Sequence, residues 1–206
     1  MIAGDSLIPD FVFERAARGR GFATICGIDE AGRGPWAGPV VAAAVILDEN
    51  NFPSGLNDSK KLTAEKREKL FGEILTTSVV GIGIGDEARI DRDNILAATL
   101  WAMGEAAGQL GARPDLALVD GNRSPRLFCM VETIVEGDCR SLSIAAASII
   151  AKVTRDRLMI ELDRQFPAYG FAHHKGYGTA LHQAALRQHG PCPHHRKTFK
   201  PIAALL

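Results

Sequence analysis

Five short apolar runs, each bounded by glycine, proline or polar residues, recur along the chain. Runs of this length between turn-forming residues are typical of buried β-strands rather than of helices. They predict strands at residues 24–29, 39–47, 79–85, 115–120 and 131–135. The first two strands should be neighbours, with the glycine-rich segment EAGRGPWAG connecting them.

Helical spacing of apolar residues appears in the middle of the chain. Between Leu62 and Leu75, leucine and isoleucine recur among charged residues, which predicts an amphipathic helix over residues 63–77. The alanine, leucine and methionine content of residues 94–110 predicts another helix, which Gly111 and Pro114 end.

The chain changes character after Asp138. Residues 141–166 are rich in alanine, isoleucine and leucine and contain neither glycine nor proline, which predicts one long helix closed by Pro167. Residues 169–178 form a glycine- and histidine-rich loop, and residues 179–189 form a further helix. This order of elements predicts an α/β fold, a mixed sheet with helices packed on it, followed by a helical C-terminal extension.

Length and composition set the broad class of protein. The chain has 206 residues, of which 46% are apolar, as expected for one globular domain with a full core. Its longest nearly apolar stretch, residues 36–47, is too short to span a bilayer. Acidic residues (Asp5, Asp10 and Glu14) stand where a secretory signal needs a basic start. We therefore expect a cytoplasmic protein without membrane association.

The formal net charge of zero hides an uneven distribution. Residues 1–139 carry 14 Lys and Arg against 21 Asp and Glu, a balance of −7. Residues 140–206 carry 10 against 3, a balance of +7, together with all six histidines. Such asymmetry can mark a nucleic-acid-binding surface, although solvated helix faces would produce it as well.

The cysteines form no paired CxxC pattern, so reduced structural thiols are the default interpretation. They are Cys26, Cys129, Cys139 and Cys192. A zinc-stabilised interaction domain is an alternative, because several candidate ligands gather near the C-terminus: His173, His174, Cys192, His194 and His195. Their spacing matches no usual zinc finger.

Four acids lie at predicted strand ends. Asp29 and Glu30 end the first strand, Asp120 ends the fourth, and Asp138 lies between the fifth strand and the long helix. Converging carboxylates repel one another unless cations lie among them, and hard oxygen ligands suit Mg²⁺ or Mn²⁺. Two such ions about 4 Å apart can support phosphodiester hydrolysis.

Each acid also has a simpler interpretation. Asp138 could stabilise the start of the long helix, and Asp120 could form a turn with Gly121. Asp29 and Glu30 are adjacent, and adjacent strand residues point to opposite faces. They can share one site only if the strand bends or stops there, which the glycines of the following GRG segment make plausible.

The segment GIDEAGRGPWAGPV resembles the signature of ribonuclease HII, the type 2 bacterial ribonuclease H. The resemblance continues in the same order over nearly the whole chain, in LNDSKKLT, LVDGN, EGD, SIAAASIIAKVTRD, YGFAHHKGYGT and HGPCPHHRKTF. One departure is Cys139, which stands where that family is expected to have serine.

The resemblance implies a ribonuclease H-like mixed five-stranded sheet flanked by helices, with a catalytic domain at residues 1–166 and a helical extension at 167–206. It implies an endonuclease, acting as a monomer in ribonucleotide excision repair, that cleaves the RNA strand of RNA–DNA hybrids and nicks DNA duplexes at single ribonucleotides. The products carry 5′-phosphate and 3′-hydroxyl ends. By position, the residues that bind Mg²⁺ or Mn²⁺ in a two-metal mechanism are Asp29, Glu30, Asp120 and Asp138.

The resemblance also implies a substrate-recognition set. Gly32, Arg33 and Gly34 match the motif whose backbone contacts the ribose 2′-hydroxyl, and Tyr177 matches a tyrosine that stacks on the following sugar. A tight turn and a packed aromatic are the simpler interpretations of these two features. Lys60 and Lys152 are candidate contacts to the nucleic-acid backbone, although single lysines are more often solvated.

One alternative class shares the fold but not the activity. A non-catalytic nucleic-acid-binding module would use the basic C-terminal part for salt-sensitive binding and would show no metal-dependent cleavage. The intact set of acids argues against it.

Overall fold

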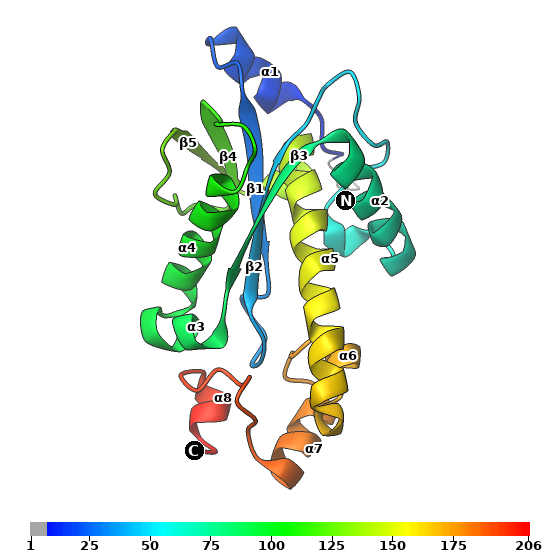
Figure 1. The fold of residues 1–206 in the computed structure, drawn as a ribbon, viewed down its shortest axis with the longest axis vertical. Helices are drawn as coiled ribbons and strands as arrows, with labels where there is room; N and C mark the ends of the chain where they lie inside the picture. Colours follow the sequence, from blue (N-terminus) through cyan, green and yellow to red (C-terminus); the bar gives the residue numbers. More distant parts are fainter. Residues whose placement is uncertain (1–7) are drawn as a thin grey trace, which may run out of the picture.

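A five-stranded mixed sheet forms the centre of the protein (Figure 1) in the computed structural model, which describes residues 8–206. All five predicted strands are present: β1 (Ile25–Ala31), β2 (Val40–Ile46), β3 (Val79–Gly85), β4 (Leu116–Asp120) and β5 (Met130–Ile134). Their order is β3-β2-β1-β4-β5, with β1 antiparallel to β2 and parallel to β4. The predicted fold class, a mixed five-stranded sheet flanked by helices, is therefore confirmed. Asp5 of the N-terminal segment lies outside the described residues.

The four predicted helices are present within a few residues of their expected bounds: α2 (Ala64–Thr77), α4 (Ile95–Gly108), α5 (Leu142–Gln165) and α7 (Ala180–His189). The patterns did not predict four shorter helices, namely α1 (Val12–Gly19), α3 (Glu87–Asp93), α6 (Phe171–His174) and α8 (Lys200–Ala203). Single turns of 3₁₀-helix are η1 (Ser59–Lys61), η2 (Gly137–Cys139) and η3 (Pro167–Tyr169). The predicted loop at 169–178 thus contains the one-turn helix α6.

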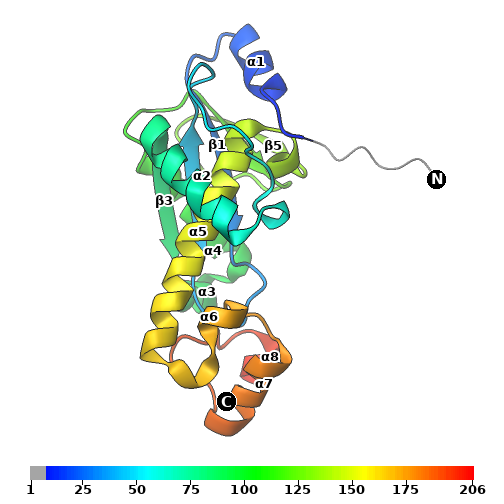
Figure 2. The same ribbon diagram turned by 90° about the vertical axis from the view of Figure 1, so that its right-hand side faces the viewer.

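Helices α4 and α5 cover opposite faces of the sheet. Alternate residues of β1 divide between the two cores: Cys26 and Ile28 pack with α4, and Ile25 packs with Ile144 of α5. Gly27 lets the start of α5 lie directly on β1, since a Cβ there would fall 2.1 Å from the carbonyl carbon of Ser143. Figure 2, turned by 90°, shows α2 outside α5 on the same face.

The C-terminal extension packs on the far end of α5, below the sheet in Figure 1. Met159 and Leu162 from the last turns of α5 join one apolar cluster with Phe171, Leu186 and Ile202. A single helix therefore contacts both the sheet and the extension. Over residues 8–206, no helix is both long and apolar enough to cross a membrane.

Candidate active site

Asp29 and Asp120 lie side by side at the carboxyl ends of two parallel strands. The last pair between β1 and β4 is Ile28 with Val119, so the two aspartates occupy the next position on each strand. Each aspartate lies four residues after a member of the pair Ile25 and Leu116, and alternate strand residues share a face. Both side chains are therefore on the face covered by α5. Asp29 is only 4% exposed.

Asp138 reaches this place from the turn η2, just before α5. The backbone N–H of Gly137 donates to Asp120 Oδ1 at 2.7 Å, which ties the turn to the end of β4. Asp138 is itself buried. The turn that precedes the long helix therefore brings a third carboxylate toward the two at the strand ends.

The pKa values of Asp29, Glu30 and Asp138 are raised by burial and by neighbouring acids. The pKa of Asp29 is raised well above its usual value, first by burial and then by Glu30, Asp120 and Asp138. Burial also raises the pKa of Glu30, which Arg33 lowers and Asp120 raises. For Asp138, burial, Asp58 and Asp120 raise the pKa. We call Asp29, Glu30, Asp120 and Asp138 the carboxylate cluster.

Glu30 joins this cluster although it follows Asp29 directly. β1 stays paired with β2 as far as Ala31 but leaves β4 after Ile28, and Gly32 then turns the chain with a φ of 98°. The strand therefore ends next to the two acids, as sharing one site requires. The Glu30 carboxylate accepts a 3.4 Å bond from Arg33 Nη1.

Divalent ions fit the chemistry of this cluster. Its donors are carboxylate oxygens, and burial followed by repulsion from neighbouring carboxylates raises the pKa of Asp29 and Asp138. A hard cation bound by several carboxylates removes that repulsion, which is the usual way in which proteins hold Mg²⁺ or Mn²⁺.

Asp58 is a further acid at this site that the sequence patterns did not single out. It caps the start of η1, accepts a bond from the Lys60 backbone N–H at 2.9 Å, and is 8% exposed. Asp58 also lies near Asp138 and Cys139. Within residues 8–206, these three form the one group of His, Cys, Asp or Glu side chains whose potential ligand atoms all lie within 4.8 Å of one another. In the sequence, Asp58 stands two residues before Lys60 in the polar segment NDSKK.

The two candidate lysines lie in different surroundings. Lys60 Nζ is 3.5 Å from Asp138 Oδ2 and 3.9 Å from Asp58 Oδ1, at the edge of the carboxylate cluster. Lys152 Nζ instead donates to Asp156 Oδ1, one turn further along α5, at 2.7 Å. Only Lys60 is thus brought to the acids.

The GRG loop, residues 32–38, lies against the loop that carries Tyr177. Trp36 N–H donates to the Gly176 carbonyl at 2.8 Å, and a Cβ on Gly34 would lie 3.6 Å from Cε1 of Tyr177. Tyr177 is 47% exposed, which does not suit a core-packing role. The structure therefore brings Gly32, Arg33, Gly34 and Tyr177 to one surface.

The C-terminal histidines form bonds with one another and with the backbone. Nε2 of His182 and Nε2 of His195 are 2.9 Å apart, and the His174 ring stacks on His182 with centroids 4.4 Å apart. Burial lowers the pKa of both His182 and His195 to about 4, so the rings are neutral. We call His174, His182 and His195 the histidine cluster.

The zinc alternative gains no support from this arrangement. The His195 ring is bonded to the Cys192 backbone as well as to His182, and His174 bonds the Tyr169 carbonyl. His194 bonds Glu87, and His173 is exposed. The ring nitrogens of His174 and His195 are therefore already bonded within the protein.

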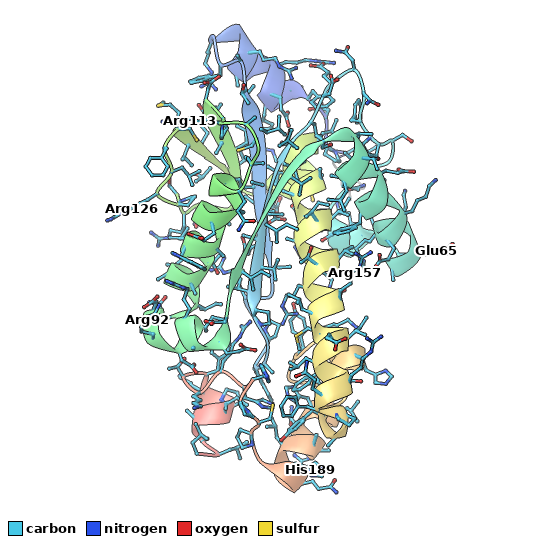
Figure 3. All side chains as sticks on the ribbon, viewed as in Figure 1. Glu65, Arg92, Arg113, Arg126, Arg157 and His189 are labelled. Carbon is cyan, nitrogen blue, oxygen red and sulfur yellow. The ribbon has the colours of Figure 1, made fainter. Side chains whose placement is uncertain are left out.

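One groove lies away from the carboxylate cluster. It encloses about 810 Å³ between α4 and the loop before β5, near Trp101 and Phe128. Arg113 and Arg126, which also line it, are labelled on that side in Figure 3. None of the four acids of the carboxylate cluster lines this groove.

Comparison with known proteins agrees with this geometry. A profile of the family described as Ribonuclease HII matches residues 26–202. A ribonuclease HII of Rhizobium meliloti (strain 1021) is 58% identical over 196 residues, 95% of this chain and 91% of the relative.

Solved structures give the same result. Ribonuclease H2 from Pyrococcus horikoshii OT3 matches with a TM-score of 0.74 at 28% identity, covering 89% of this chain and 97% of that one. The ribonuclease HII of Archaeoglobus fulgidus, solved as a complex with PCNA, matches with a TM-score of 0.73 at 27% identity, covering 86% and 95%. Fold, acids and sequence agree over most of the chain, which therefore belongs to the ribonuclease HII family of metal-dependent endoribonucleases.

Proposed function

We propose that this ribonuclease cleaves the RNA strand of RNA–DNA hybrids and nicks duplex DNA at single embedded ribonucleotides, leaving 5′-phosphate and 3′-hydroxyl ends. The observation that carries the proposal is the position of the carboxylate cluster beside the exposed GRG loop, to which Arg33 and Glu30 connect it. The groups proposed for hydrolysis and the loop proposed to recognise the ribose thus lie next to each other.

Asp29, Glu30, Asp120 and Asp138 are the proposed ligands of two Mg²⁺ or Mn²⁺ ions. When bound, such a pair of ions activates a water molecule and stabilises the charge that develops on the phosphodiester. The protein prepares this site by burying Asp29 and by holding Asp120 through the Gly137 N–H, so the ligands need little rearrangement.

The GRG loop and Tyr177 are the proposed substrate-recognition set. Glycines at 32 and 34 let backbone groups approach a ribose without a Cβ in the way, and the 2′-hydroxyl distinguishes RNA from DNA. The half-exposed ring of Tyr177 beside Gly34 can stack on the neighbouring sugar. Lys60, at the edge of the carboxylate cluster, and Lys152, which is not in contact with that cluster, are proposed to contact the phosphate backbone.

We further propose that residues 1–166 form the catalytic domain and residues 167–206 its extension, and that the protein acts as a cytoplasmic monomer. The non-catalytic alternative is opposed by the family to which the chain belongs. It would have required loss of the acids, which are all present.

Cleavage-site mapping tests the proposal most directly. The substrates are a DNA duplex with one ribonucleotide and an RNA–DNA hybrid, each with Mg²⁺ and then with Mn²⁺. We expect a cut at the ribonucleotide or within the RNA strand, and a loss of at least about 1,000-fold in Asp120→Asn, equivalent to about 4 kcal/mol of barrier. Exposed Glu105→Gln on α4 is the matched control. Undiminished cleavage by folded Asp120→Asn would refute the assigned site.

A further inference from the structure

Two fully buried arginines lie behind the GRG loop, one from each part of the chain. Arg155 of α5 is 1% exposed, and Arg196, from the segment between α7 and α8, is 0% exposed. Within residues 8–206, neither guanidinium is within ion-pair distance of a carboxylate. Buried charges are normally paired, so two unpaired ones need a specific reason.

Both guanidiniums are satisfied by backbone carbonyl oxygens. Arg196 donates to the carbonyls of Gly32 (2.6 Å), Arg33 (3.0 Å) and Gly38 (2.9 Å). Arg155 completes the arrangement from the other side, with bonds to the carbonyls of Pro39 (2.9 Å), Ala37 (3.2 Å) and Lys175 (3.0 Å). Together they hold most of the carbonyls between Gly32 and Pro39, together with one carbonyl of the loop that carries Tyr177.

The arginines leave little freedom at Gly32. Its φ of 98° favours glycine, and a Cβ there would fall 2.0 Å from Nε of Arg155. The buried Arg155 therefore leaves no room for a side chain at Gly32, whether or not a ligand binds the exposed side of the loop.

The direction of these carbonyls fixes the direction of the amides that follow them. In a trans peptide the C=O of one residue and the N–H of the next point in opposite directions, and the described chain has no cis peptide. Because the carbonyls of Gly32 and Arg33 point inward to Arg196, the N–H groups of Arg33 and Gly34 point outward. Within residues 8–206, neither amide donates to a protein acceptor, and both residues are exposed.

The segment that carries Arg196 is itself attached to the same loop. Arg196 N–H donates to the Trp36 carbonyl at 2.8 Å, and Gly38 N–H donates to the His194 carbonyl at 3.0 Å. These backbone bonds already hold residues 36–38. The Arg196 side chain adds what they lack, a contact to the carbonyls of Gly32 and Arg33 at the other end of the loop.

Keeping a charge in this place is unfavourable, which argues against a role in simple packing. Burial, followed by the nearby charge of Arg155, lowers the pKa of Arg196 to about 9. An apolar side chain of similar length would fill the same volume without this penalty, but it would leave the inward carbonyls unsatisfied.

We propose that Arg196 is a positioning residue that directs the amides of Arg33 and Gly34 at the ribose of the substrate, so that the C-terminal extension contributes to ribonucleotide selectivity. This inference rests on the proposed function of the GRG loop. It assigns to the extension a role in recognition, not in the hydrolytic step.

The test compares the affinities of a DNA duplex with one ribonucleotide and of the same all-DNA duplex, measured with Ca²⁺ to prevent cleavage. Wild-type protein should prefer the first. Arg196→Lys keeps the charge but loses the planar fork of donors, and Arg196→Met loses both. We expect the ratio of affinities to fall about tenfold in each variant, whereas exposed Arg187→Met on α7 keeps the wild-type ratio.

The outcomes separate the two proposals. Absence of any preference in the wild type would refute the proposed function itself. A wild-type preference that Arg196→Lys retains, in protein shown to be folded by circular dichroism, would overturn the role of Arg196 alone. A structural role would lower the unfolding temperature without changing the ratio.

A measurement on wild-type protein covers the case in which the variants do not fold. The amide ¹H and ¹⁵N signals of Arg33 and Gly34 should shift on addition of the duplex with one ribonucleotide, and much less with the all-DNA duplex. Equal shifts with both duplexes, or no shift with either, would overturn the inference.

Discussion

The histidine cluster is buried and the carboxylate cluster is buried in part, at Asp29 and Asp138, and the polar atoms of the two clusters are satisfied in different ways. His174, His182 and His195 bond one another or the backbone and remain neutral. Among the acids, Asp29 and Asp138 experience net repulsion from neighbouring carboxylates, and the lysine nearest to Asp138 is largely exposed. Titratable groups that satisfy one another stabilise a fold, whereas those left in mutual repulsion indicate a site for a cation.

This comparison predicts opposite responses to acid. The pKa of His182 and His195 is about 4, so between pH 6.5 and 4 the unfolded chain takes up protons that the folded protein does not. The free energy of unfolding should therefore decrease as the pH falls through this window, by about 3 kcal/mol for each ring. Urea unfolding at a series of pH values measures this decrease.

A substitution assigns the effect to the rings. His195→Asn should make the pH dependence shallower, whereas exposed His173→Asn should not. The acids contribute with the opposite sign, because the raised pKa values of Asp29 and Asp138 let the folded protein take up protons first. A slope that His195→Asn leaves unchanged would contradict the assignment of neutral, buried rings.

A smaller effect is expected from the acids in the absence of metal. Asp29→Asn removes one repelling charge, so it should raise the free energy of unfolding in EDTA by about 1 to 2 kcal/mol while abolishing cleavage. Mg²⁺ should stabilise wild-type protein, by about 2.7 kcal/mol at a concentration 100 times its Kd, and should stabilise the variant much less. Calorimetry with and without Mg²⁺ measures both effects, with Glu105→Gln as control. Equal stabilisation of both proteins by Mg²⁺ would argue against Asp29 as a ligand.

The smallest effect should distinguish the two lysines. Lys60, at the edge of the carboxylate cluster, is placed to contact a phosphate, so Lys60→Ala should reduce the slope of log affinity against log salt by about one. Lys152→Ala should change it less, because Lys152 is paired with Asp156. Titrations of labelled duplex at several KCl concentrations provide the slopes, and exposed Lys69→Ala on α2 is the control. A larger change in Lys152→Ala would reverse this order.

Much of the fold could be predicted from local patterns. The strands were recognisable because each apolar run ends at turn residues, and α5 because residues 141–166 lack both glycine and proline. The short helices were not, because one or two turns carry too little periodicity. The boundary between α3 and α4 depends on Asn94, which has a φ of 68° and caps α4 through its side chain.

The candidate site likewise contains residues that the sequence could predict and residues that it could not. Asp29, Asp120 and Asp138 were found because strand ends are visible in the sequence, and the family resemblance supplied Tyr177. Asp58 was missed because an acid in a polar turn is common, and its proximity to Asp138 exists only in three dimensions. Arg155 and Arg196 were missed because nothing in a sequence distinguishes a buried arginine from a solvated one.

Because α5 is one continuous helix, it restricts where residues can be inserted or deleted. Arg155 follows Leu142 by thirteen residues, which a helix converts to a fixed rise of about 20 Å. One inserted residue between them would rotate everything beyond it by about 100° and turn Arg155 away from Gly32. The number of residues in this part of the helix is therefore as strongly constrained as their identity.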